Sequence, residues 1–260
     1  MALLGDVPER AAGWPEEVPV PSTPLLVDTG ECRVLIDTGG GPLAPTTGRL
    51  EENLAAAGFS PDDIGLVVLS HAHPDHIGGL LRADGSERFP HARVAMPRQD
   101  YEFWHKEGTR RLIEAGSLYR IPRMNLVIAG FIERCLPPVR DRLEWLDDGR
   151  EVVPGISAFP SPGHTPGHMC ISVASTGESL IFSGDVLIVP EQVAQPEWTS
   201  AFDLDRPQLV ETRRRLFDRA AADRSILYGY HMQRPGRVVR RGAAYEWEPS
   251  TSPSGLQWTP

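Results

Sequence analysis

The stretch IGLVVLSHAHPDH occupies residues 64–76 and joins a short apolar run to a dense cluster of metal-binding side chains. Ile64 to Leu69 has the length and composition of a buried strand, and the cluster begins two residues after it. Four of the six residues from His71 to His76 carry imidazole or carboxylate groups, which suit zinc and other first-row metals. Functional side chains commonly lie in the loop that follows a strand of an α/β fold. The stretch therefore predicts half of a two-metal site at a strand end.

Two metal ions need roughly seven or eight ligands, which one hexapeptide cannot supply. His71 and His73 alternate, so an extended loop directs both to one side, and Asp75 and His76 can face a second metal. The remaining ligands must come from other strand ends or glycine-rich turns. Candidates at such places are His164, Asp185 and His231.

Two residues near these motifs have other expected roles. His168 lies four residues after His164, and we expect a structural histidine that hydrogen bonds to a loop. Asp37 ends a strand ahead of the metal motif. It either accepts a hydrogen bond from a ligand histidine or is an ordinary turn carboxylate, and the sequence leaves both interpretations open.

Composition limits the class of protein. The chain has 260 residues, 40% of them apolar, which suits one domain over residues 1–260 with an N-terminal extension at 1–20 and a surface tail at 246–260. A net charge of −9 disfavours nucleic acid and anionic membranes as partners. No signal peptide or membrane-spanning run is visible, so a cytoplasmic protein is expected. The three separated cysteines, Cys32, Cys135 and Cys170, are expected to be free thiols.

The rest of the chain alternates strand-like and helix-like segments. Helices are expected at residues 49–57, 101–118 and 208–222, where apolar residues recur with helical spacing. Short strands are expected between them, at residues 24–27, 33–37, 64–69, 94–96, 142–146, 151–153, 156–159, 170–173, 179–182 and 224–228. Strand clusters separated by helices predict an α/β fold of layered sheets and helices.

The order of these motifs resembles that of the metallo-β-lactamase superfamily: Asp37 after a strand, the His71–His76 motif, then His164, Asp185 and His231. The resemblance runs from about residue 24 to 240 and implies a four-layer αββα sandwich with the metals at one edge of the two sheets. The resemblance implies, by position, that one metal would be held by His71, His73 and His164. The other would be held by Asp75, His76 and His231, and Asp185 would bridge the two.

Within the superfamily the chain resembles the methyl parathion hydrolase and N-acyl homoserine lactone lactonase group. The supporting segments include residues 47–50, 89–92, 101–104, 184–198, 202–203, 212–215 and 231–236. Many homoserine lactone lactonases have a tyrosine three residues after the bridging aspartate, where this chain has Ile188. The resemblance therefore predicts the hydrolase more firmly than this particular substrate.

The predicted activity is hydrolysis of an ester, lactone or phosphotriester in a small, hydrophobic molecule by water that two metal ions activate. Zinc is the expected metal, with iron and manganese as alternatives. Asp75 and Asp185 would orient the water, and one of them would pass a proton to the leaving group. The alternative functions are a thioesterase or an iron-dependent redox enzyme of the same fold.

Aromatic and apolar residues between the motifs are candidates for the substrate pocket, although packing in the core is an equally good interpretation of each. They are Phe103, Trp104, Leu118, Tyr119, Ile188 and Trp198. A small-molecule substrate is the expected partner, and a homodimer is a candidate assembly.

Overall fold

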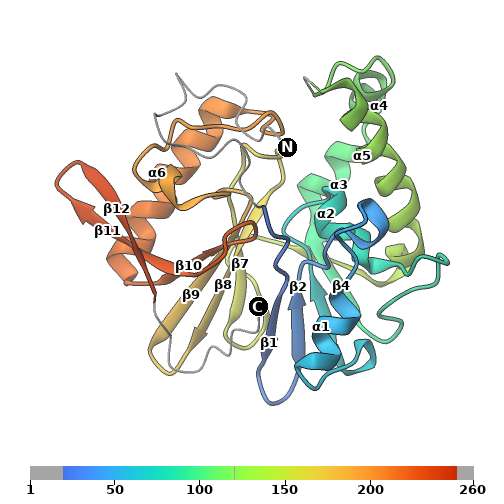
Figure 1. Ribbon diagram of the computed structural model, residues 1–260, viewed down its shortest axis with the longest axis horizontal. Helices are drawn as coiled ribbons and strands as arrows, with labels where there is room; N and C mark the ends of the chain where they lie inside the picture. The colour runs from blue at the N-terminus through green and yellow to red at the C-terminus, as the bar shows by residue number, and fades with distance from the viewer. Residues whose placement is uncertain (1–19, 120, 251–260) are drawn as a thin grey trace.

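The computed structural model describes residues 20–119 and 121–250. Within them, two sheets pack face to face and helices cover the outer face of each (Figure 1). The αββα sandwich expected from the sequence is confirmed. The first sheet has the order β1-β2-β3-β4-β5, and the second has the order β12-β11-β10-β9-β8-β7-β6.

The first sheet is built from the N-terminal half of the chain. Its strands are β1 (Leu25–Asp28), β2 (Arg33–Ile36), β3 (Leu66–Val68), β4 (Arg93–Pro97) and β5 (Leu143–Leu146). β1 and β2 form an antiparallel hairpin, and β2 to β5 run parallel. The carboxyl ends of β2, β3 and β4 therefore lie at one edge of the sheet, and the loops that follow them meet there.

The second sheet is built from the C-terminal half. Its strands are β6 (Glu151–Val153), β7 (Ile156–Pro160), β8 (Met169–Ser175), β9 (Glu178–Gly184), β10 (Ile226–Gly229), β11 (Gly236–Arg241) and β12 (Ala244–Pro249). All neighbours are antiparallel except β9 and β10, which are parallel and so end at the same edge.

The helices divide between the two outer faces. Those on the first sheet are α1 (Leu50–Ala56), α2 (Pro74–Ile77), α3 (Arg98–His105), α4 (Glu107–Glu114) and α5 (Pro122–Cys135), and α6 (Arg206–Asp223) covers the second (Figure 1). Short 3₁₀ turns are η1 (Gly41–Leu43), η2 (Pro61–Asp63), η3 (Gly78–Leu80), η4 (Pro137–Arg142) and η5 (Pro190–Val193). No helix in the described residues has both the length and the apolar character needed to span a bilayer.

Strand alternation produces three separate hydrophobic layers. In β2, Val34 and Ile36 face the second sheet, whereas Leu35 between them faces the helices, because successive side chains point to opposite faces. The layer between the sheets contains strand residues from both, such as Leu66 and Phe182. The remaining layer lies between the second sheet and α6 and includes Phe217 and other residues of that helix.

Several element boundaries differ from the sequence-based expectation. The helix expected over 101–118 is broken at Lys106, whose backbone is extended. Trp104 and Ile113 are nine residues apart, which at about 100° per residue would place them on opposite faces of one helix. Both are buried in the same layer, so the chain must turn between them.

Two further differences concern segments with weak local signals. Helix α5 was not predicted, because Gly130 and several β-branched residues lower the helical signal of an otherwise apolar run. Residues 246–249, expected in the C-terminal tail, belong to β12, which pairs with β11 along its whole length. The rest of the expected tail, from residue 251, and the extension at 1–19 lie outside the described residues.

Differential thiol reactivity tests this packing. The three cysteines are free, as expected, with Cys135 and Cys170 buried and Cys32 half-buried. Burial raises the pKa of the Cys135 thiol to about 11 and that of Cys170 to about 12, which suppresses the reactive thiolate. With Ellman's reagent we expect about one thiol to react quickly in native protein and all three after denaturation. Rapid modification of Cys170 in native protein would contradict the packing of β8.

Candidate metal centre

The expected ligands lie in four loops that meet where the two sheets adjoin. The loop after β3 carries His71, His73, Asp75 and His76 and leads into α2. The other three come from the second sheet, from the β7–β8 loop, the end of β9 and the end of β10. They are His164, Asp185 and His231 respectively. The structure thus brings together all seven residues that the sequence singled out, in two groups.

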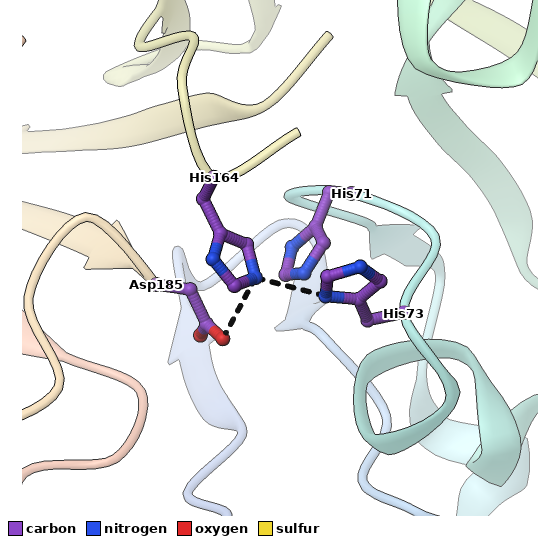
Figure 2. Close-up of side chains that lie close together, drawn as sticks. All are labelled: His71, His73, His164 and Asp185. Carbon is purple, nitrogen blue, oxygen red and sulfur yellow. Dashed lines mark hydrogen bonds and ion pairs between the residues drawn. The ribbon is translucent and has the colours of Figure 1, made fainter. Parts of the chain in front are cut away.

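The first group consists of four buried residues whose ligand atoms lie within 4.8 Å of one another: His71, His73, His164 and Asp185. Figure 2 shows the three imidazole rings and the Asp185 carboxylate converging on a common point. Nε2 of His164 lies 2.8 Å from Nδ1 of His73 and 3.2 Å from Oδ2 of Asp185. His73 therefore presents Nδ1 to the centre of the group.

The second group consists of Asp75, His76 and His231, again with ligand atoms within 4.8 Å of one another. Nε2 of His231 lies 3.3 Å from Oδ2 of Asp75. Asp185 lies between the two groups, with Oδ1 3.1 Å from Nε2 of His76 and Oδ2 3.3 Å from Nε2 of His231. One carboxylate thus contacts histidines of both groups.

Asp37 holds the loop that follows β3 through hydrogen bonds. It follows β2 with a φ of +59°, in the left-handed region that aspartate tolerates better than most residues. Its carboxylate accepts hydrogen bonds from the backbone N–H and hydroxyl of Ser70 and from Nδ1 of His76, each at 2.8 Å. The structure therefore supports Asp37 as the acceptor for a candidate ligand histidine rather than as an ordinary turn carboxylate.

Each of the other histidines also has a partner on the ring nitrogen that faces away from its group. Nδ1 of His164 donates to Oδ1 of Asp203 at 2.7 Å, and Nδ1 of His231 donates to the Pro21 carbonyl at 2.8 Å. Nε2 of His73 lies 2.7 Å from the Tyr119 hydroxyl. Such partners fix the tautomer and the ring orientation of a ligand histidine.

The sequence did not reveal these partnerships. The sequence indicates Asp203 only through a family resemblance and Tyr119 only as a candidate pocket residue. Asp203 and His164 are 39 residues apart and come together only in the folded chain. From the sequence one can expect only that each buried ligand histidine needs a hydrogen-bond partner for its second ring nitrogen, without knowing which residue supplies it.

His168 is a structural histidine, in agreement with the expectation. Its Nε2 accepts the backbone N–H of Asp185 at 3.2 Å, so its Nδ1 carries the proton and donates to the Ser161 hydroxyl at 2.7 Å. A Cβ added at Gly184 would lie 2.5 Å from the same Nε2, so this close approach requires glycine. Burial lowers the pKa of His168 to about 3, which keeps the ring neutral.

Neighbouring carboxylates separate two kinds of buried histidine in the centre. Burial, with repulsion from neighbouring histidines, holds the pKa of both His71 and His73 well below the ordinary value. Burial also opposes protonation of His164, but the carboxylates of Asp185 and Asp203 outweigh it and raise the pKa to about 9. In the same way Asp185 and Asp75 raise the pKa of His231 to about 10.

The carboxylates of the centre remain ionised for the complementary reason. Burial raises the pKa of Asp75, but His76 and His231 outweigh it and lower the value to about 2. His231 and His76 likewise hold the pKa of Asp185 well below its usual range against the effect of burial. A metal ion bound here would meet anionic oxygens and would displace protons from the imidazoles.

Unpartnered buried atoms test whether the residues fit a metal. Apart from Nη2 of Arg213, the buried side-chain atoms without a hydrogen-bond partner among the described residues are Nε2 of His71, Nε2 of His76 and Oδ1 of Asp185. The 3.1 Å approach of the last two lacks hydrogen-bond geometry. Buried polar atoms are costly unless they are paired, and all three are metal-ligand atoms of two adjacent groups. The donor set and its unpaired atoms therefore fit divalent metal ions.

The candidate pocket residues divide between core and site. Trp104, Tyr119 and Ile188 are buried, and Trp104 and Tyr119 have rings 5.8 and 5.9 Å from that of His73. Phe103 and Leu118 pack against the layer between the first sheet and its helices. The interpretation as core residues therefore holds for most of the set, while Tyr119 contacts a candidate ligand directly.

The chain is similar in sequence to proteins of a known family. A family model described as the metallo-beta-lactamase superfamily matches residues 18–231, which confirms the resemblance seen in the motifs. The N-acyl homoserine lactonase of Bacillus thuringiensis is 27% identical over 176 residues, which cover 64% of this chain and 57% of the lactonase. The uncharacterized protein YobT of Bacillus subtilis (strain 168) is 25% identical over 182 residues, covering 67% of this chain and 71% of YobT.

A solved structure shares most of the fold. AidC, described as a dizinc quorum-quenching lactonase in complex with a product, superposes with a TM-score of 0.78 and 26% identity. The superposition covers 88% of this chain and 79% of AidC. These similarities support the expectation of a metal-dependent hydrolase.

The contact between Asp203 and His164 can be tested by metal affinity. We expect Asp203→Ala to weaken binding of Zn²⁺ by roughly 10- to 100-fold, because the ring of His164 loses the acceptor that orients it. Competition with a chromophoric chelator measures the affinity.

Asp205 supplies a matched control two residues away. Its carboxylate caps α6 by accepting the backbone N–H of Gln208 at 3.0 Å and makes no contact with a candidate ligand. Asp205→Ala should cost about 1 kcal/mol of stability and leave the Zn²⁺ affinity unchanged. Equal affinities in both variants and the wild type would contradict the role of Asp203.

Proposed function

Because the chain belongs to the metallo-beta-lactamase superfamily, we propose that it hydrolyses a lactone or ester of a small, hydrophobic molecule with two divalent metal ions. The observation that carries the proposal is the pair of ligand groups joined by Asp185, with unpartnered ligand atoms buried in both. A binding module would have no need to bury so many unpaired donors and acceptors.

The two groups suggest how the metals would be held. One would bind His71, His73 and His164, and a second would bind Asp75, His76 and His231. Asp185 would contribute to both, since Oδ1 faces His76 of the second group and Oδ2 lies near both His164 of the first group and His231 of the second. Zinc is the first candidate, because imidazole and carboxylate ligands suit it and AidC is described as a dizinc enzyme.

When bound, such ions lower the pKa of water toward neutrality and polarise the oxygen of a carbonyl group. Proton transfer would then fall to the carboxylates. The side chain of Asp75 is 25% exposed, compared with 5% for Asp185, so it is more accessible to water and substrate. We assign to Asp75 the acceptance of a proton from the attacking water and its delivery to the leaving oxygen.

The more buried Asp185 would instead act in positioning. Its backbone N–H is fixed by His168, and its carboxylate is surrounded by His76, His164 and His231. A carboxylate held so tightly is poorly placed to carry a proton to a substrate. Its place between the two groups suits a role in setting their separation.

The proposed substrate class rests on the relatives and on one difference from many lactonases, at position 188. Both AidC and the Bacillus thuringiensis relative are described as lactonases, which favours a lactone or ester over a phosphotriester. At position 188, where many homoserine lactone lactonases have tyrosine, Ile188 is 97% buried and has no polar side-chain group. Any hydrogen bond to the substrate must therefore come from another residue, and the acyl-homoserine lactone itself is only one member of the proposed class.

Metal removal and two substitutions test the proposal together. Treatment with a chelator should abolish turnover of lactones and aryl esters, and Zn²⁺, Mn²⁺, Fe²⁺ or Co²⁺ should restore it to different extents. We expect His73→Ala and Asp185→Ala to lower kcat/KM by roughly 100-fold or more, because each removes a ligand. The substrate panel should include phosphotriesters and thioesters to separate the hydrolase classes.

His91 provides the control, since it is an exposed histidine outside the centre. His91→Ala should keep wild-type turnover. Turnover that survives metal removal would contradict the proposal. Consumption of dioxygen by iron-loaded protein without hydrolysis would favour the redox alternative instead.

A further inference from the structure

A further buried carboxylate supports the candidate metal centre without contacting the side chain of any candidate ligand. Asp100 lies in the first turn of α3, directly after β4, and is completely buried. Its Oδ2 accepts hydrogen bonds from the backbone N–H of Ala72 at 2.8 Å and from Nε1 of Trp104 at 3.0 Å. Its Oδ1 accepts the hydroxyl of Thr165 at 2.5 Å. The carboxylate therefore accepts hydrogen bonds from its own helix and from two other segments of the chain.

The position of Asp100 mirrors that of Asp37. In the first sheet β3 lies between β2 and β4, and the loop after β3 carries four candidate ligands. Asp37 follows β2 and accepts the N–H of Ser70, and Asp100 follows β4 and accepts the N–H of Ala72. The β3 loop is thus held from both flanks by buried carboxylates.

Asp100 differs from Asp37 in joining two ligand-bearing loops. Ala72 lies between His71 and His73, and Thr165 is adjacent to His164. Thr165 lies 65 positions after Asp100 in the sequence, and the two loops belong to different sheets. One carboxylate therefore spans the gap between the loops that supply the three histidines of the first group.

The backbone is packed to permit this contact. A Cβ added at Gly167 would lie 2.0 Å from the backbone nitrogen of Asp100 and 2.4 Å from its Cα. The loop of His164 therefore approaches the start of α3 as closely as glycine allows. Across the same junction, Nε2 of His164 lies 2.8 Å from Nδ1 of His73.

A buried carboxylate is an unfavourable choice if stability alone matters. The three donors to Asp100 are uncharged, and burial raises the pKa of its carboxyl group against their effect. An apolar residue at such a position often stabilises a fold at least as well. What the carboxylate supplies is two acceptor atoms at a fixed separation, one for each loop.

We propose that Asp100 is a positioning residue that sets the distance between the His71–His73 loop and the His164 loop, and thereby the metal affinity and geometry of the first group. The inference rests on the proposed metal centre. Outer partners of ligand histidines typically change metal affinity by roughly 10- to 100-fold, and Asp100 would act one step further out, through the loop backbones.

The test uses Co²⁺ as the probe, because its visible absorption reports ligand geometry. Metal-free wild type, Asp100→Ala, Thr165→Val and Thr165→Ser are titrated with Co²⁺, and the absorption spectra are recorded. Ile64→Val is the stability control, since it removes one core methyl group at the opposite end of β3 from the ligand loop.

We expect Asp100→Ala and Thr165→Val to weaken at least one Co²⁺ binding step by about 10-fold and to alter the visible band. Thr165→Ser retains the hydroxyl and should restore both affinity and spectrum. Ile64→Val should lower the melting temperature without changing either.

Wild-type Co²⁺ affinity and spectrum in folded Thr165→Val and Asp100→Ala would overturn the inference. If Asp100→Ala fails to fold, the Thr165→Val and Thr165→Ser pair decides, because both keep the carboxylate and its other two hydrogen bonds. A wild-type protein that binds no Co²⁺ would instead contradict the metal centre itself, so the two failures are distinguishable.

Discussion

The hydrophobic layer between the two sheets is the packing interaction on which the rest of the molecule depends. Residues such as Val34, Ile36 and Leu66 of the first sheet pack against Phe182 and Ile226 of the second. This packing brings the carboxyl end of β3 beside those of β9 and β10. Without it neither sheet could assemble the centre alone, because the first sheet contributes one loop and the second contributes three isolated residues.

The candidate metal centre places many polar groups next to this hydrophobic layer, which would be unfavourable if they lacked hydrogen-bond partners. Their arrangement is stable because nearly every ring nitrogen that faces outward has a partner. Carboxylates serve His76 and His164, whereas neutral oxygens serve His71, His73 and His231. What remains unpaired is concentrated on the inward-facing atoms, where it can act on metal ions. Three of the four buried side-chain atoms that lack a hydrogen-bond partner among the described residues therefore lie in the centre, and the fourth is Nη2 of Arg213.

This division explains why family membership and substrate identity are decided by different residues. The ligand groups and their supports depend on strand ends and on buried hydrogen bonds, which leave little freedom for substitution. The proposed substrate class depends instead on side chains outside the two ligand groups. Ile188, which is buried and has no polar side-chain group, lies outside both of them.

The sequence by itself determined the fold class and the set of candidate ligands. The motif from His71 to His76 is contiguous, and the other candidates each follow an apolar strand or a glycine-rich turn, so local pattern was sufficient to single them out. Only the tertiary structure decided which groups orient them, because the contacts of Asp203, Tyr119 and Asp100 join residues 28 to 65 positions apart. It also decided the break at Lys106, since that turn is required by the burial of Trp104 and Ile113 in one layer. Local periodicity indicates which residues are buried. The pairing of buried polar groups depends instead on which strand ends lie side by side once the two sheets pack together.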